Sequence, residues 1–117
     1  MIFQAGDIVL VDWRDALPKE PNKLRPAVVV EDSELFDPSY PNLIVVPLAS
    51  DLHLRIADLS VSIPPTSENG CERQSYALAH HVTTASKRRI TATPSRITAE
   101  ELAAIRRLIA VAIGILP

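Results

Sequence analysis

The chain has 117 residues, which is enough for one domain with its own core and too few for two. Apolar residues make up 47% of it and charged residues 22%, a balance that excludes a disordered chain. The formal net charge of −2 argues against a protein that coats nucleic acid without specificity, although it leaves room for a small basic site.

The single cysteine, Cys71, cannot form an internal disulfide. The N-terminal residues show no signal-peptide pattern, so the sequence predicts a reducing, cytoplasmic location. The most apolar stretch, residues 102–116, is interrupted by Arg106 and Arg107 and is too short to span a bilayer. No membrane association is therefore expected.

Six segments in the first four-fifths of the chain are predicted to be β-strands, because they alternate or are rich in β-branched residues. The second and third are apolar on both faces, which predicts central strands buried on both sides. The pair Asn69-Gly70 predicts a hairpin turn between the fourth and fifth. The six segments are residues 7–13, 26–32, 43–48, 58–63, 76–82 and 89–92.

A single helix is predicted near the C-terminal end of the sequence. Thr98 and Glu101 have the spacing of a capping box, and Gly114 offers a stop. Several short strands followed by one helix predict a mainly β domain, a small and strongly bent β-barrel closed by that helix. The apolar stripe expected to face the core consists of Leu102, Ile105, Ile109, Ala112 and Ile113.

Arg25 stands immediately before Pro26, at the mouth of an apolar run that ends at Val30. Proline fixes the first residue of the strand and biases Arg25 toward an extended backbone. A guanidinium held beside a rigid strand suits contact with a phosphate. Taken alone, the pattern leaves a second interpretation open, in which Arg25 pairs with a carboxylate where the strand begins.

Five segments follow one another in a recognisable order. They are Gly6-Asp7-Ile8-Val9-Leu10-Val11-Asp12, Arg25-Pro26 with its valines to Val30, Val45-Val46-Pro47-Leu48-Ala49-Ser50, Ser75-Tyr76-Ala77-Leu78, and Lys87-Arg88-Arg89-Ile90 with the capped helix. In this order they resemble the MazF/PemK family of bacterial toxins, which shares an SH3-like barrel with the CcdB gyrase poisons. The resemblance covers nearly the whole chain and implies one domain of this type over residues 1–117.

The resemblance implies the toxin of a type II toxin–antitoxin system, an endoribonuclease that cuts single-stranded RNA such as mRNA at short sequences. It also implies a homodimer and a cognate antitoxin whose tail fills the RNA groove. Cleavage in the family uses no metal or other cofactor, because the ribose 2′-OH attacks the neighbouring phosphorus and leaves a cyclic phosphate. Arg25 matches the family's catalytic arginine, where it would stabilise the phosphorane. A guanidinium holds its proton too firmly to act as the general base.

Two positions depart from the family pattern. The family's second catalytic residue is a threonine, and Ala49 takes its place; the neighbouring Ser50 can substitute only if the strand ends or bulges there. His80 and His81 stand where the family usually has an acidic residue and a glutamine. Strand alternation would put His80 on an apolar face and His81 on the more polar face with Ser75, where a neutral imidazole can accept the 2′-OH proton. Adjacent strand residues point in opposite directions, so no shared metal site is expected.

Basic and aromatic residues predict the RNA-binding surface. Trp13 is suited to stacking on an unpaired base, or else to capping the end of the barrel. The cationic candidates are Arg14, Lys19, Lys23, Arg55 and Arg73.

Two other functions remain open from the sequence. One is a non-enzymatic poison of the CcdB type, which binds gyrase through the dimer surface and the C-terminal helix. The other, suggested by Ala49, is a family member that binds RNA or an antitoxin without cleaving RNA.

Overall fold

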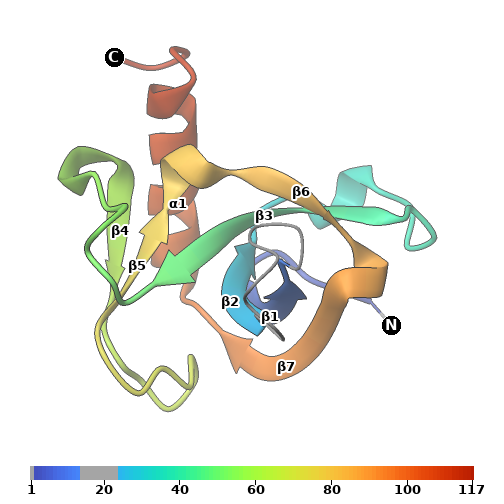
Figure 1. The fold of residues 1–117 in the computed structure, drawn as a ribbon. Helices are drawn as coiled ribbons and strands as arrows, with labels where there is room; N and C mark the ends of the chain where they lie inside the picture. The colour runs from blue at the N-terminus through green and yellow to red at the C-terminus, as the bar shows by residue number, and fades with distance from the viewer. Residues whose placement is uncertain (1, 14–23) are drawn as a thin grey trace.

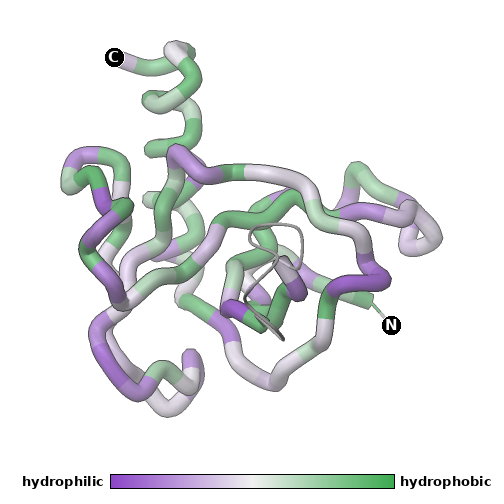
Figure 2. Tube along the Cα trace, in the orientation of Figure 1, coloured by the Kyte–Doolittle hydropathy of each residue, from purple (hydrophilic) through white to green (hydrophobic). Residues whose placement is uncertain are grey.

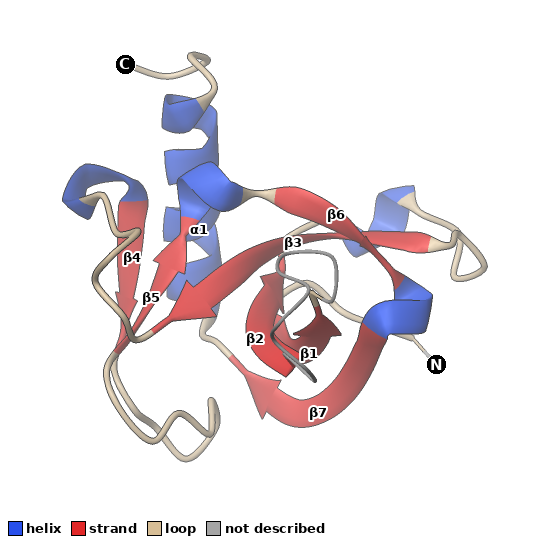
Figure 3. Ribbon diagram, in the orientation of Figure 1, coloured by secondary structure: helices blue, strands red, loops and turns tan. Residues whose placement is uncertain are grey.

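The computed structural model describes residues 2–13 and 24–117. Within them the chain forms seven strands, four short 3₁₀ helices and one α-helix (Figures 1 and 3). The strands are β1 (Asp7–Asp12), β2 (Leu24–Val29), β3 (Asn42–Ala49), β4 (Ser60–Ile63), β5 (Ser75–Leu78), β6 (Thr83–Ser86) and β7 (Ile90–Arg96). The helices are η1 (Ser33–Leu35), η2 (Ala57–Leu59), η3 (Ala79–His81), η4 (Lys87–Arg89) and α1 (Ala99–Ala112). No helix in the described part of the chain has the length and apolar character needed to cross a membrane.

Strand β3 connects the two parts of the sheet. The strand order is β4-β5-β3-β2-β1-β7, and every pair recorded among the described residues is antiparallel. One edge of β3 pairs with β2, while its other edge pairs first with β6 and then, at its last two residues, with β5. Strand β6 continues through η4 into β7, which returns to β1, so that the strands curl into a barrel (Figure 1). The predicted mainly β fold with one C-terminal helix is confirmed.

Two clusters of buried apolar side chains lie on opposite faces of the sheet. Alternate residues of β2 enter different clusters, since Val28 belongs to one and Val29 to the other, and both are fully buried. The first cluster also contains Ile105 of α1, so the helix covers that face. Figure 2 shows hydrophobic residues along most of β1, β2 and β3. The prediction that β2 and β3 are buried on both faces is confirmed.

Helix α1 begins at the predicted capping box. The Thr98 hydroxyl accepts a hydrogen bond from the Glu101 N–H at 3.0 Å, and the Glu101 carboxylate accepts one from the Thr98 N–H at 2.9 Å. The stripe prediction is correct for the first part of the helix and wrong for its end. Ala112 and Ile113 are exposed, because the last turn of α1 extends beyond the sheet that it covers (Figure 1).

Replacing Thr98 by alanine removes one half of this capping box. The Glu101 N–H then loses its acceptor, and we expect the free energy of unfolding to fall by about 1 kcal/mol. Urea unfolding followed by circular dichroism measures the change. Thr98→Ser keeps the hydroxyl and should stay close to the wild type; equal losses in both variants would contradict a capping role.

The predicted strand over residues 76–82 is wrong in its second half. Strand β5 ends at Leu78, and Ala79–His81 form η3, which contacts α1. Ala77, Leu78 and Ala79 are all buried in succession. A strand with one core face would expose every second residue, so the packing against α1 takes precedence over the alternation seen in the sequence.

Other elements also differ from the sequence prediction. Strand β2 begins at Leu24, two residues before the predicted start at Pro26, and ends at Val29, three residues before the predicted end. Residues 58–63 begin within η2 and become extended only at Ser60. The strand predicted over residues 89–92 continues to Arg96 through Pro94, which an edge strand tolerates. Strands β4 and β5 do pair as a hairpin, but residues 64–74 join them in a long loop in place of a tight turn.

Candidate active site

A cavity of about 450 Å³ opens where β1, β2 and β3 meet the loop between β4 and β5. Apolar residues of the three strands form part of its lining. Three predicted site residues from three separate segments also line it: Arg25, Ser50 and Arg73. Two carboxylates outside the predicted set, those of Asp51 and Glu72, also line the cavity. The cavity therefore offers both cations and proton acceptors.

Strand pairing fixes the backbone position of Arg25. It is the second residue of β2 and lies opposite Val11 of β1. On the other edge, β2 and β3 pair Ala27 with Pro47, and the same register continued by two residues brings Arg25 opposite Ala49. Its side chain is exposed and lines the cavity. A short strand between two partners thus carries this guanidinium to the solvent-facing end of a buried scaffold.

Ser50 could replace the family's threonine only if the strand ended or bulged beside it, and the strand does end there. Strand β3 ends at Ala49, and Ser50 lies in the bend that follows, exposed to solvent. Both residues line the cavity. Because the strand stops there, the alternation that would turn Ser50 away from the site no longer applies.

The loop between β4 and β5 is ordered by a buried asparagine, Asn69, which was predicted only as part of a hairpin turn. Asn69 is 3% exposed, and its side-chain oxygen accepts hydrogen bonds from the N–H groups of Thr66 and Cys71 at 3.0 and 2.9 Å. Its amide donates to the Pro64 carbonyl at 2.8 Å. These bonds hold the loop in the form that brings Arg73 to the cavity.

Gly70 completes the same turn. Its φ is +65°, and a Cβ at this position would lie 2.7 Å from the Oγ of Ser95. Both facts favour glycine here. The turn therefore packs directly against β7, which fixes one wall of the cavity.

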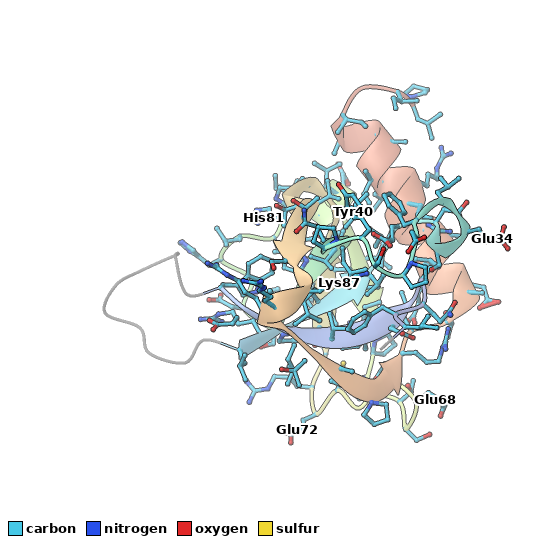
Figure 4. The ribbon with its side chains drawn as sticks, turned by 90° about the vertical axis from the view of Figure 1, so that its right-hand side faces the viewer. Glu34, Tyr40, Glu68, Glu72, His81 and Lys87 are labelled. Atoms are coloured by element: carbon cyan, nitrogen blue, oxygen red, sulfur yellow. The ribbon has the colours of Figure 1, made fainter. Side chains whose placement is uncertain are left out.

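His81 lies in η3 and is not among the residues that line the cavity. Figure 4 shows it in the upper part of the view, while Glu72, which lines the cavity, lies at the lower edge. The His81 ring contacts the His80 ring edge-on, with 4.4 Å between the two centroids. Partial burial, and then repulsion from His80, lower the pKa of His81 below its ordinary value of 6.5. The alternation that assigned it to a polar strand face fails, because β5 ends before it.

The lowered pKa of His81 predicts a pH-dependent stability. As the pH falls through 6.5, the unfolded chain binds this proton before the folded protein does, so the free energy of unfolding decreases on acidification. The His81→Gln variant should lose less stability between pH 7.5 and 5.5 than the wild type. Thermal unfolding over that range measures the difference, and parallel curves for the two proteins would contradict it.

The other predicted RNA-binding residues lie in different places. Arg55 stacks on the ring of Tyr76, and Trp13 lines a separate cavity of about 230 Å³ together with Arg89. Arg14, Lys19 and Lys23 lie outside the described residues. Within residues 2–13 and 24–117, no cluster of three or more histidine, cysteine or acidic side chains has the arrangement of a metal site.

The chain is similar to known toxins in sequence and in fold. The family model of PemK-like, MazF-like toxins of type II toxin–antitoxin systems matches residues 4–113. No curated protein sequence matches the chain.

Solved structures with the same fold include MazF from Deinococcus radiodurans, with a TM-score of 0.74, 19% identity, and coverage of 97% of this chain and 98% of that one. An endoribonuclease from a mycobacterial species in complex with its cognate antitoxin gives a TM-score of 0.70 at 16% identity, covering 98% and 95% of the two chains. The Mycobacterium tuberculosis toxin MazF-mt6 gives 0.70 at 18% identity, covering 95% and 98%. At these identities the similarity establishes the fold.

Proposed function

This chain belongs to the PemK-like, MazF-like toxin family of type II toxin–antitoxin systems, and on that premise we propose that it is a sequence-selective endoribonuclease. Its substrate is single-stranded RNA, and cleavage requires no metal ion. One observation carries the proposal: Arg25 of β2 and Ser50, in the bend just after β3, line the same open cavity. A guanidinium and a hydroxyl that line one open cavity can both donate to a phosphorane.

The proposed reaction starts at the ribose on the 5′ side of the scissile bond. Its 2′-oxygen forms a bond to phosphorus as its proton leaves, and the bond from phosphorus to the 5′-oxygen breaks. The leaving oxygen takes up a proton, and a cyclic phosphate remains on the 5′ fragment. Arg25 stabilises the added charge on the phosphorane, while the Ser50 hydroxyl donates to one of its oxygens.

The proton of the 2′-OH needs an acceptor within hydrogen-bonding reach. Asp51 and Glu72 line the cavity, so we assign the role to one of these carboxylates. The general base predicted from the sequence, His81, lies outside the lining. Its role is tested by the pH–rate profile of His81→Gln, which loses its acidic limb if the imidazole accepts the proton and keeps that limb if a carboxylate does.

We further propose that the protein acts in the cytoplasm as a homodimer and is inhibited by a cognate antitoxin. The similar mycobacterial endoribonuclease was solved in complex with its cognate antitoxin, which supports an antitoxin partner. Ile113 and Ile115, which follow the last residue of α1, are 61% and 70% exposed, and this supports an apolar contact between subunits. Sedimentation equilibrium of the wild type and of Ile113→Asp tests the dimer.

The function is tested by incubating the purified protein with a long single-stranded RNA in the presence of EDTA. We expect a set of discrete fragments that end in cyclic phosphate. Intact RNA together with inhibited DNA supercoiling would support the alternative of a gyrase poison. Intact RNA that is nevertheless bound would support a family member without catalytic activity.

A further inference from the structure

Arg55 is held in place by an aromatic ring. It belongs to the loop between β3 and η2, and its guanidinium carbon lies 4.3 Å from the centroid of the Tyr76 ring. The side chain is half-buried, and its Nε is buried without a hydrogen-bond partner. Among residues 2–13 and 24–117, nothing forms an ion pair or a hydrogen bond with this guanidinium, so packing on the ring accounts for its position.

The ring lies beside the proposed active site. Tyr76 of β5 is the direct partner of Ala49, the last residue of β3. Ala49 lines the cavity, and the continued register of β2 and β3 brings Arg25 opposite its other side. Arg25, Ala49 and Tyr76 thus form one row across three neighbouring strands. With neighbouring strands about 4.8 Å apart, the backbones of Arg25 and Tyr76 are separated by roughly 10 Å.

This row places Arg25 on one side of Ala49. On the other side lies Tyr76, with the Arg55 guanidinium stacked on its ring. Directly opposed residues in a sheet present their side chains to the same face, so Tyr76 shares a face with Ala49 and, by the continued register, with Arg25. Tyr76 and Arg55 lie outside the lining of the cavity itself, next to Ala49 at its edge. Stacking occupies one face of the guanidinium, and because Nε is buried, the two terminal Nη groups remain as the donors. Those donors match the geometry of a phosphate.

We propose that Arg55, oriented by Tyr76, binds an RNA phosphate next to the scissile one, on the side of Ala49 opposite Arg25. This inference rests on the proposed function and adds a second phosphate subsite to it. Tyr76 acts as a positioning residue through its ring. The pair would fix the register of the RNA strand, so that the correct 2′-oxygen reaches the scissile phosphorus at Arg25.

The test uses a cleavable RNA oligonucleotide and a matched analogue with a 2′-deoxy sugar at the attacking position, which binds but cannot react. Single neutral methylphosphonates replace, one at a time, the phosphates on either side of the scissile one. We expect Arg55→Ala to weaken binding of the analogue about 10- to 100-fold. One methylphosphonate should weaken binding to the wild type by a similar factor and have little further effect on Arg55→Ala.

Three further variants separate a phosphate contact from a structural role. Tyr76→Phe keeps the ring and should bind like the wild type, whereas Tyr76→Leu should resemble Arg55→Ala. Arg107→Ala removes the same charge from an exposed position on α1 and should leave binding unchanged. The slope of log affinity against log salt should fall by about 0.7 in Arg55→Ala, as for one lost contact to single-stranded nucleic acid.

The outcomes distinguish this inference from the function on which it rests. If the wild type cleaves RNA while Arg55→Ala shows the same affinity and the same methylphosphonate pattern, the second subsite is wrong and the nuclease stands. Equal losses at every methylphosphonate position in both proteins would also overturn the subsite. A wild type that neither binds nor cleaves RNA overturns both.

Discussion

The Arg25→Ala variant is expected to cut RNA on the order of 100- to 1,000-fold more slowly than the wild type. Arg25 lines the proposed active-site cavity. In the proposed reaction its charge faces the phosphorus that becomes five-coordinate. An interaction that strengthens as negative charge develops lowers the barrier more than it tightens substrate binding. The loss should therefore fall mainly on kcat, measured with a fluorescent oligonucleotide under saturating RNA.

The matched control for this prediction is Arg25→Lys. It keeps the charge but loses the planar pair of donors, so we expect an intermediate rate. Arg25 is exposed at the end of a short strand, and its replacement should leave the thermal unfolding temperature nearly unchanged. If Arg25→Ala is folded and still cuts at the wild-type rate, the assignment of the phosphorane-stabilising group is wrong.

Local signals in the sequence were sufficient for much of the fold. The capping box at Thr98 is confirmed atom by atom, because it depends only on residues three apart. The continuous apolar runs of β2 and β3 predicted burial on both faces, and Val28 and Val29 are fully buried. Where the pattern and the packing agree, the sequence is a reliable guide.

The failures lie where a distant element decides the conformation. Residues 79–81 alternate acceptably for a strand, yet they form η3 because they pack against α1. The end of α1 has the right spacing for a buried face, yet Ile113 has no sheet beneath it. Neither the distance from η3 to the helix nor the length of the sheet below α1 can be read from local periodicity.

Some residues of the candidate site could be predicted from local sequence patterns, whereas others became visible only in the fold. The motif order selected Arg25 and Ser50, but only the end of β3 at Ala49 shows why Ser50 lines the cavity. No local pattern singles out Asp51 as a lining residue, because a carboxylate in a loop is common. Asn69 was visible as a turn signal, whereas its buried side chain and the loop that it orders required the fold.

Ser50 is the second residue whose replacement should have a large effect. Without its hydroxyl, the phosphorane loses one donor, and we expect Ser50→Ala to slow cleavage on the order of 100-fold. Ser50→Thr keeps the hydroxyl at an exposed position and should retain most of the rate. The measurement is kcat on the same oligonucleotide, with circular dichroism as the check on folding.

Position 49 provides the decisive comparison for this assignment. The family resemblance expects a threonine there, and Ala49 lines the same cavity as Ser50. If Ser50 has taken over the threonine's task, the double variant Ala49→Thr/Ser50→Ala should recover a substantial part of the rate lost in Ser50→Ala. If Ser50→Ala has no effect and Ala49→Thr alone raises the rate, then the hydroxyl of Ser50 contributes nothing. In that case the wild type works with Arg25 alone as the donor to the phosphorane.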